Sequence, residues 1–268
     1  MSNRVSSPVN KILDNWRRWQ APFQSKPQLV KQLEGGLTNI SYLIEAGSER
    51  AVLRVNNPDA SKLGVNRQTE ITILKHLASK AWVPTVYFAD QTYLVSEYIE
   101  GENLHTTVDK NTQQEISNLL NELQKIEIAD LNQFSYRINC QLLCQRIAGD
   151  YLSQSTANYI LNLGCQIDNQ DWRPALCHHD LMAENIILNG KGIYIIDWEY
   201  AGMGHPQFDY LRIFTDEQKK SLAVHDFDPK LQTYQTLIDQ LWYAVRYPEL
   251  QPDLQSKLND IIETGQTE

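Results

Sequence analysis

The sequence predicts an α+β fold of two lobes, in which a small N-terminal lobe carries an antiparallel five-stranded sheet and one helix. The larger C-terminal lobe is expected to be mainly helical. Early in the chain, apolar residues alternate with polar ones, which is the spacing of half-buried strands. Later they recur every three or four residues, which is the spacing of amphipathic helices. A polar break near residue 100 separates the patterns, so we expect lobes at residues 1–99 and 100–268.

The N-terminal lobe is expected to begin with a short amphipathic helix at residues 11–19, followed by three strands. A helix at residues 66–79 comes next, and Pro84 ends that segment because proline cannot continue a helix. Two further strands complete the sheet. The five strands are expected near residue 28 and at residues 40–45, 51–55, 85–89 and 93–98.

The C-terminal lobe is expected to begin with a helix at residues 113–127, for which Thr112 and Glu115 have the spacing of a capping box. Residues 137–163 also have a helical pattern. A hairpin of two short apolar strands interrupts the helices, with Asn189-Gly190 as its turn. The hairpin strands are expected at residues 185–188 and 193–196, and later helices within residues 231–247 and 253–263.

The composition describes a globular protein of 268 residues with a formal net charge of −9. This charge argues against a nucleic-acid or anionic-membrane partner, because both require a basic surface. No apolar stretch approaches the ~20 residues of a membrane helix, and the first residues lack the apolar core of a signal peptide. The four cysteines are irregularly spaced, as expected for reduced core thiols. We therefore expect a cytoplasmic protein that acts on a small molecule.

The run of residues 177–188 carries the strongest chemical signal in the chain. His178, Asp180 and Asn185 have the spacing His-x-Asp-x-x-x-x-Asn, and Asp197 follows the next apolar strand. This arrangement is typical of the catalytic loop of kinase-type phosphotransferases. Asp180 is then the candidate base for an acceptor hydroxyl, whereas Asn185 and Asp197 offer hard oxygen ligands for Mg²⁺. Alternatively, Asp180 could simply cap a turn and Asn185 could begin a strand. Each explanation would suffice for one residue alone, but they do not account for both residues together with Asp197.

A glycine pair after the first strand is a candidate phosphate loop. Gly35 and Gly36 permit close approach of the backbone to phosphate oxygens, and Thr38 and Asn39 follow them directly. Two adjacent glycines also occur in ordinary turns, so this alternative remains open.

Arg54 ends a strand in an apolar setting, where a charge is costly unless it is paired. Glu70, on the following helix, is its expected partner. Together they resemble the basic residue and helix glutamate that orient the α- and β-phosphates of ATP in kinases. The alternative is that both are solvated surface charges.

These motifs resemble the aminoglycoside phosphotransferase and choline kinase superfamily, and within it the bacterial choline- and thiamine-kinase-like branch. The resemblance covers residues 28–247 and is most specific at residues 178–185 and 195–202. It implies a bilobal, protein-kinase-like fold that uses ATP and Mg²⁺. It also implies that residues 95–99, including Glu97 and Ile99, contact adenine through backbone groups.

The resemblance further implies an acceptor that is a small cationic alcohol of the choline or thiamine type. Glu199, Tyr200 and Trp242 are expected at the acceptor site, because aromatic faces attract cations. Asp209 is a further candidate charge partner, whereas residues 181–184 contain nothing that would fix the acceptor. An aminoglycoside phosphotransferase and a non-catalytic nucleotide-binding module remain alternatives. Acidic residues that could serve an aminoglycoside are Asp216, Glu217, Asp226 and Asp228.

Overall fold

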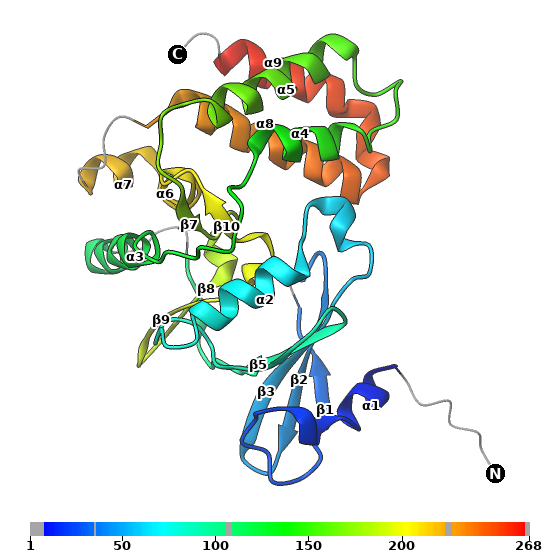
Figure 1. Cartoon of the computed structure of the whole chain (residues 1–268), viewed down its shortest axis with the longest axis vertical. Helices are drawn as coiled ribbons and strands as arrows, with labels where there is room; N and C mark the ends of the chain where they lie inside the picture. Colours follow the sequence, from blue (N-terminus) through cyan, green and yellow to red (C-terminus); the bar gives the residue numbers. More distant parts are fainter. Residues whose placement is uncertain (1–7, 35, 106–108, 223–226, 266–268) are drawn as a thin grey trace, which may run out of the picture. The chain divides into compact units, whose positions relative to one another are not determined.

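The computed structural model describes residues 8–34, 36–105, 109–222 and 227–265, and Figure 1 shows its elements. The chain forms two compact units. Unit 1 comprises Met1–Ala60, Arg67–Leu104 and Ala183–Trp198, and unit 2 comprises Ser61–Asn66, His105–Met182 and Glu199–Glu268. The sequence analysis expected one boundary, between residues 99 and 100. The two units are instead each made of three segments, because the hairpin at residues 183–198 belongs to unit 1.

Unit 1 contains the expected five-stranded antiparallel sheet, in the order β1-β2-β3-β5-β4. Its strands are β1 (Gln28–Gln32), β2 (Ile40–Ala46), β3 (Glu49–Val55), β4 (Val86–Ala89) and β5 (Tyr93–Glu97). The helix α2 (Arg67–His76) connects β3 to β4. The expected N-terminal helix is split into α1 (Pro8–Leu13) and the 3₁₀ turn η1 (Trp16–Arg18).

The two faces of this sheet differ because successive side chains of a strand point in opposite directions. On one face, Ala51 and Leu53 of β3 are fully buried and pack with Ile44 and the N-terminal segment. Arg54, the neighbour of Leu53, points to the opposite face, where Glu70 of α2 meets it. The register of β3 thus separates an apolar core from a charged site.

A second sheet of unit 1 contains the predicted hairpin, with strands in the order β6-β8-β9. These are β6 (Glu102–Asn103), β8 (Ile186–Asn189) and β9 (Gly192–Ile195). The N–H of Ile195 donates to the carbonyl of Trp82, and the rings of Trp82 and Trp198 lie 5.9 Å apart. These contacts explain why the hairpin belongs to unit 1.

Four helices of unit 2 pack around a shared apolar core and lie together in Figure 1. They are α4 (Tyr136–Cys144), α5 (Gln154–Asp168), α8 (Pro229–Arg246) and α9 (Leu254–Gly265). The helical pattern expected over residues 137–163 corresponds to two helices, α4 and α5. The chain breaks between α4 and α5, and Ser153 caps the new N-terminus by accepting a hydrogen bond from the N–H of Thr156.

Unit 2 also contains a further helix, a pair of short strands and two short helices. The helix α3 (Lys110–Leu123) is capped by Asp109, which accepts from the N–H of Thr112, so the expected capping box of Thr112 and Glu115 was wrong. The strands β7 (Ala175–Cys177) and β10 (Gly202–Gly204) pair antiparallel. Two short helices, α6 (Phe208–Ile213) and α7 (Asp216–Ser221), were not predicted. The chain as a whole has further 3₁₀ turns, of which η3 (Ala183–Asn185) belongs to unit 1 and η5 (Pro248–Asp253) to unit 2, whereas η2 (Ala60–Leu63) and η4 (Trp198–Tyr200) lie where the chain passes between the units.

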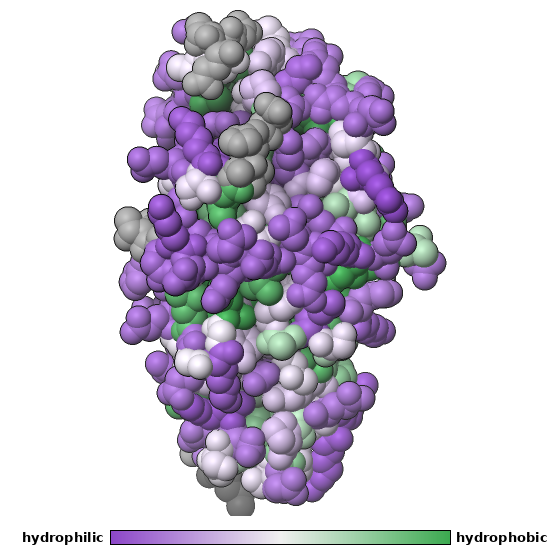
Figure 2. Space-filling model, turned by 90° about the vertical axis from the view of Figure 1, so that its left-hand side faces the viewer, coloured by the Kyte–Doolittle hydropathy of each residue, from purple (hydrophilic) through white to green (hydrophobic). Residues whose placement is uncertain are grey.

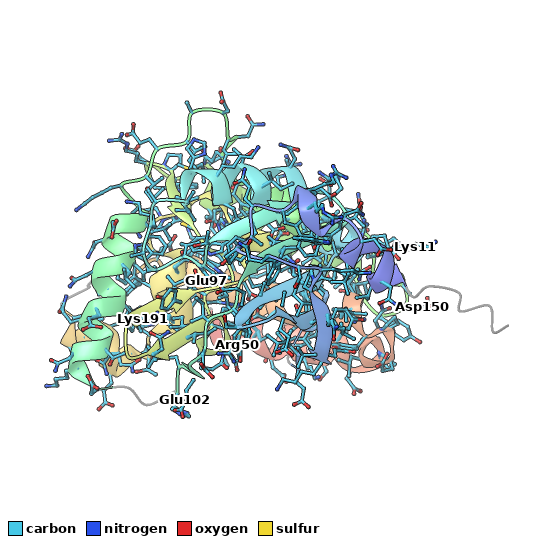
Figure 3. The ribbon with its side chains drawn as sticks, turned by 90° about the horizontal axis from the view of Figure 1, so that it is seen from below. Lys11, Arg50, Glu97, Glu102, Asp150 and Lys191 are labelled. Carbon is cyan, nitrogen blue, oxygen red and sulfur yellow. The ribbon has the colours of Figure 1, made fainter. Side chains whose placement is uncertain are left out.

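The surface carries most of the charge that the composition implies. The face drawn in Figure 2 is mainly hydrophilic, with apolar areas that are small and scattered. Lys11, Arg50, Glu102 and Lys191 have exposed side chains, and Figure 3 labels them. Among the described residues, no helix combines the length and the apolar character that crossing a membrane would require.

Candidate active site

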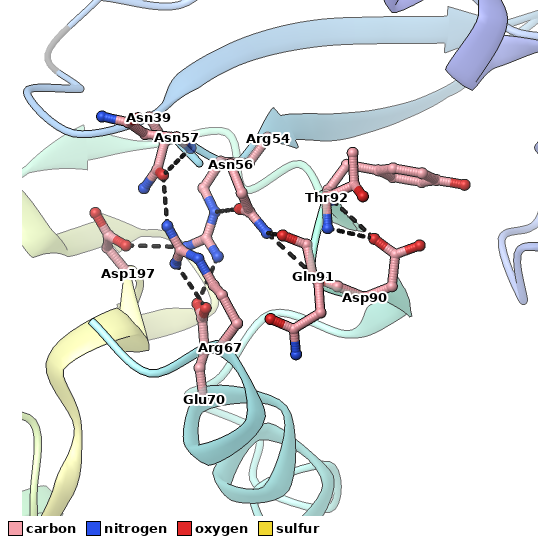
Figure 4. A network of polar contacts seen from close by, with 11 residues as sticks. Asn39, Arg54, Asn56, Asn57, Arg67, Glu70, Asp90, Gln91, Thr92 and Asp197 are labelled. Carbon is pink, nitrogen blue, oxygen red and sulfur yellow. Dashed lines mark hydrogen bonds and ion pairs between the residues drawn. The ribbon is translucent and has the colours of Figure 1, made fainter. Parts of the chain in front are cut away.

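Arg54 is the centre of a polar network in unit 1 (Figure 4). Its Nη2 donates to Glu70 Oε1 at 2.6 Å, and its Nη1 donates to Asp197 Oδ1 at 3.0 Å. Its Nε donates to Asn56 Oδ1 at 3.1 Å. Arg54 is 7% exposed and Glu70 is 2% exposed. The structure therefore brings Arg54, Glu70 and Asp197 into direct contact, with the guanidinium fixed on three sides.

Arg67 is a second guanidinium in this network, and the sequence analysis missed it. Its Nη1 donates to Glu70 Oε2 at 2.8 Å, and its Nη2 donates to Asn39 Oδ1 at 2.7 Å. Glu70 thus lies between two arginines, one of which holds a residue of the candidate phosphate loop. The spacing of Arg67 and Glu70, three residues apart on one helix, is the signal that could have identified it.

The candidate phosphate loop is tightly folded where the structure describes it. A Cβ atom on Gly36 would lie 2.7 Å from the carbonyl oxygen of Asn39, so no side chain fits there. Asn39 is buried and also accepts from the N–H of Asn57 at 3.2 Å, whereas Thr38 is half-buried. Gly35 lies outside the described residues.

Asn185 and Asp197 come from facing ends of the hairpin in unit 1. The N–H of Ile196, the residue before Asp197, donates to the backbone oxygen of Asn185 at 2.9 Å. Asp197 has a φ of 62°, a left-handed conformation that an aspartate adopts rarely. Such strain persists where the surroundings impose it, which is common at functional sites. Its side chain remains 35% exposed beside Arg54.

Glu97 and Ile99 lie at the end of β5 and just beyond it. The N–H of Glu97 donates to Thr85 O at 2.8 Å, and its carboxylate accepts from the N–H and the hydroxyl of Thr85. Ile99 is buried. The Glu97 N–H and side chain are therefore engaged within unit 1, and contact of residues 95–99 with adenine stays a prediction.

Glu70→Gln is expected to lower the free energy of unfolding by about 3 kcal/mol, because it leaves two buried guanidiniums without their shared carboxylate. Urea denaturation followed by circular dichroism measures this loss. Glu127→Gln is the matched control, because Glu127 pairs with Arg173 at the exposed surface, where ion pairs contribute little. Equal unfolding midpoints for the two variants would contradict the central place of Glu70.

The loop that carries Asp180 lies in unit 2 and is braced by Asp209 of α6. Asp209 accepts from the N–H of His178 at 2.7 Å and from the N–H of His179 at 3.0 Å. The N–H of Asp180 donates to His178 Nδ1 at 3.3 Å, so this ring helps to fix the backbone of the loop. Asp209 is 1% exposed and both of its carboxylate oxygens accept these bonds, whereas its role as partner of a bound cation stays a prediction.

His179, which had no predicted role, is a second brace of this loop. Its φ is 63°, and its ring stacks on Phe134 with centroids 4.3 Å apart. Its Nδ1 lies 3.2 Å from the carbonyl of Tyr200. A Cβ on Gly204 would lie 2.3 Å from its Nε2, so a glycine there is required by the close approach. Burial lowers the pKa of His179 to about 3, so its ring stays neutral at physiological pH.

Asp180 contacts a residue that the sequence analysis missed. Arg212 of α6 donates from Nη2 to Asp180 Oδ1 at 3.3 Å, and its Nη1 lies 2.7 Å from both carboxylate oxygens of Asp239 on α8. Burial raises the pKa of Asp180 to about 6, and the carboxylates of Asp239 and Glu199 add to the rise, whereas Arg212 opposes it. Asp180 is therefore an ionised carboxylate at neutral pH that gains a proton readily.

The structure brings together two of the predicted acceptor residues. Trp242 Nε1 donates to the hydroxyl of Tyr200 at 2.8 Å, and both residues belong to unit 2. Glu199 is 4% exposed, and its charge acts on Asp180. Unit 2 thus contains Asp180 and the predicted acceptor residues, whereas unit 1 contains Asn185, Asp197 and the residues predicted to bind the nucleotide.

Comparison with known proteins identifies the family. The model of the "Phosphotransferase enzyme family" matches residues 29–236. Protein LicA of Haemophilus influenzae is 29% identical over 75% of this chain, which spans 61% of that relative, less than two thirds of its length. A thiamine kinase of Escherichia coli O17:K52:H18 is 28% identical over 81% of this chain and 76% of that enzyme.

The fold agrees with a solved structure. Choline kinase LicA from Streptococcus pneumoniae matches with a TM-score of 0.76 at 21% identity, over 98% of this chain and 100% of that chain. This likeness confirms the predicted α+β, kinase-like fold. The chain therefore belongs to the phosphotransferase enzyme family.

Proposed function

We propose that this chain transfers the γ-phosphoryl group of ATP to the hydroxyl of a small cationic alcohol of the choline or thiamine type. The observation that carries the proposal is the guanidinium of Arg54, which is fixed against both Glu70 and Asp197. A buried guanidinium held in this way is preorganised for the α- and β-phosphates, because its position is set before the nucleotide binds.

Asp197 and Asn185 are the residues that would hold Mg²⁺. They fit this ion, because a carboxylate and an amide oxygen are hard ligands and Mg²⁺ takes only one or two protein carboxylates. Asp197 already lies 3.0 Å from the positive charge of Arg54 and keeps a partly exposed side chain. Held by these two residues, the ion would supply positive charge that stabilises the charge developing on the transferred phosphoryl group.

Asp180 would act as the general base. The acceptor oxygen forms the new bond to phosphorus, the bond to the bridging oxygen of ATP breaks, and ADP leaves with that electron pair. The hydroxyl proton passes to the carboxylate of Asp180. The braces on this loop, from Asp209 and His179, hold the base in place for this transfer.

Charge and aromatic groups of unit 2 support a cationic acceptor. The carboxylates of Asp239 and Glu199 act electrostatically on Asp180, and Arg212 is the cation among them. Counted with the base itself, three carboxylates and one guanidinium leave an excess of negative charge at this position. The pair of Tyr200 and Trp242 adds aromatic faces that attract a quaternary or aromatic cation. A relative at 28% identity is named a thiamine kinase, which agrees with an acceptor of this type.

An aminoglycoside acceptor is less well supported, because several acidic residues considered for it have local roles. Asp216 pairs with Lys219 at 2.7 Å, and Asp228 caps α8 by accepting from the N–H of Lys230. Asp226 lies outside the described residues. Aminoglycosides therefore enter the test as competitors of choline and thiamine.

A panel assay tests the proposed function. The full chain is incubated with ATP, Mg²⁺ and one alcohol from a panel of choline, ethanolamine, thiamine and aminoglycosides, and ADP release is followed. A cationic alcohol should raise ADP release well above the rate without acceptor, and mass spectrometry should show the phosphorylated product. Stabilisation by ATP and Mg²⁺ without turnover of any alcohol would instead favour a non-catalytic nucleotide-binding module.

The pH dependence provides a further prediction. Because Asp180 must be ionised to accept a proton and its pKa is raised to about 6, kcat/KM should be constant above this pH. Below it, kcat/KM should fall about tenfold per pH unit as the carboxylate is protonated. Initial rates from pH 5 to 8, with the acceptor far below its KM, measure this profile. An acidic limb near pH 4, where an ordinary aspartate titrates, would contradict the assignment.

A further inference from the structure

The contact between Asp180 and Arg212 belongs to a three-residue array in unit 2 that spans three separate segments. Arg212 comes from α6 and Asp239 from α8, whereas Asp180 lies on the loop after β7. The side chain of Arg212 is 14% exposed, and those of Asp180 and Asp239 are 29% and 37% exposed. Nη2 of Arg212 also lies 3.7 Å from the sulfur of Met182.

The two contacts of Arg212 differ in strength. Its Nη1 lies 2.7 Å from both oxygens of Asp239, which fixes the orientation of the planar guanidinium. Its Nη2 reaches Asp180 at the longer distance of 3.3 Å. Because a largely buried guanidinium is costly without a carboxylate, Asp239 is its anchor. Asp180 therefore lies beside a positive charge whose position is fixed. Because its own contact with Arg212 is the longer one, its carboxylate is still able to accept a proton.

We propose that Arg212, anchored by Asp239, is a positioning residue that orients the carboxylate of Asp180 and keeps it charged for the acceptor hydroxyl. This inference rests on the proposed function, because it assumes that Asp180 is the base. It also supplies what the catalytic loop lacks, since residues 181–184 contain no basic side chain. Here the positive charge beside the base comes from α6.

The electrostatic balance at Asp180 shows why such a residue is needed. The charged and titratable groups that act on this carboxylate are Asp239 from α8, Glu199 from η4 and Arg212 from α6, and the His178 ring receives the N–H of Asp180. Burial and the two carboxylates all favour the protonated form of Asp180. Arg212 is the group among them that favours the charged form. Without it, much of the base would already be protonated at neutral pH.

Three variants test the proposal. Arg212→Gln should lower kcat/KM for the acceptor at pH 7 by roughly 10- to 100-fold, the loss that a misplaced catalytic group produces. Its acidic limb should move up from about 6 by roughly one unit, because the charge that favours ionisation is gone. Arg212→Lys retains the positive charge, so the acidic limb of its pH profile should stay near that of the unmodified chain. Its kcat should fall less than that of Arg212→Gln. The KM for ATP should change less than about twofold in both variants, because the nucleotide site lies in unit 1.

Asp239→Asn separates orientation from charge. It releases the anchor of Arg212, so kcat should fall roughly tenfold. It also removes a carboxylate that raises the pKa of Asp180, so the acidic limb should stay in place or move down. An acidic limb that moves up in Arg212→Gln but not in Asp239→Asn, with a loss of rate in both variants, is the signature expected of a positioning pair. Arg173→Gln is the control, because Arg173 is an exposed arginine of unit 2 that pairs with Glu127.

A titration without turnover distinguishes failure of this inference from failure of the proposed function. The full chain is labelled with ¹³C at aspartate carboxyl groups, and Asp180→Asn assigns the signal of Asp180. Arg212→Gln should raise the observed pKa of Asp180 whether or not any alcohol is phosphorylated. Two results would overturn the proposed role of Arg212 and Asp239. One is an unchanged titration of the Asp180 carboxyl group in folded Arg212→Gln, and the other is an unchanged acidic limb in an Arg212→Gln variant that is active. Absence of turnover in the unmodified chain with an intact titration shift would count against the proposed function alone.

Discussion

Asp180→Asn is expected to lower kcat/KM for the acceptor by about 10²- to 10⁴-fold, because asparagine has the same shape but cannot take a proton from the hydroxyl. The loop should keep its fold, since its braces from Asp209 and His179 do not involve the Asp180 side chain. Binding of ATP with Mg²⁺ should therefore persist, as isothermal titration calorimetry can measure. The loss should appear in kcat, because the base acts in the transition state.

Asp150→Asn is the matched control for this experiment, because Asp150 is an exposed aspartate of the same unit. Its kinetics should equal those of the unmodified chain. If Asp180→Asn retained more than a tenth of the activity at pH 7, Asp180 would not be the base, and the motif at residues 178–185 would need another explanation.

Asp197→Asn is expected to reduce kcat/KM by about 10³-fold and to raise the Mg²⁺ concentration needed for half-maximal rate. The substitution removes the charged ligand proposed for the metal, and a metal ion contributes several kcal/mol to charge stabilisation in phosphoryl transfer. The fold should survive, because Arg54 keeps its ion pair with the buried Glu70. Titration of the rate with Mg²⁺ at fixed ATP measures both effects.

Asp14→Asn provides the comparison, since Asp14 is an exposed aspartate of unit 1 that pairs with Lys26. It should leave the Mg²⁺ dependence unchanged. An Asp197→Asn variant with normal Mg²⁺ dependence but a low rate would show that Asp197 acts through Arg54 and does not bind the metal.

The parts of the site that the sequence predicted are those with a local pattern. Alternation along β3 predicts that Arg54 faces away from Leu53, and helical spacing places Glu70 within its reach. The hairpin follows from two short apolar runs around Asn189-Gly190. In these cases the signal lies within a few residues, so periodicity and turn chemistry are sufficient.

The parts that were missed depend on tertiary structure. Arg212 and Asp239 lie on different helices, and neither has a spacing that relates it to Asp180. The break between α4 and α5 was hidden because apolar residues continue through residues 145–153, and the cap at Ser153 decides where the next helix begins. Asp109 competes with Thr112 as the cap of α3, and the carboxylate prevails, as cap preferences allow.

The alternation of side chains along β3 links the stability of the sheet to the position of Arg54. A slip of one residue in this strand would exchange Leu53 and Arg54 between the two faces of the sheet. The core would then receive a guanidinium, and Glu70 would face a leucine. No misregistered chain could therefore persist as a stable, partly active enzyme, because the register that completes the core also places the arginine proposed to bind phosphate. In this lobe, the register that gives the stable fold is also the register that places the arginine proposed to contact the nucleotide.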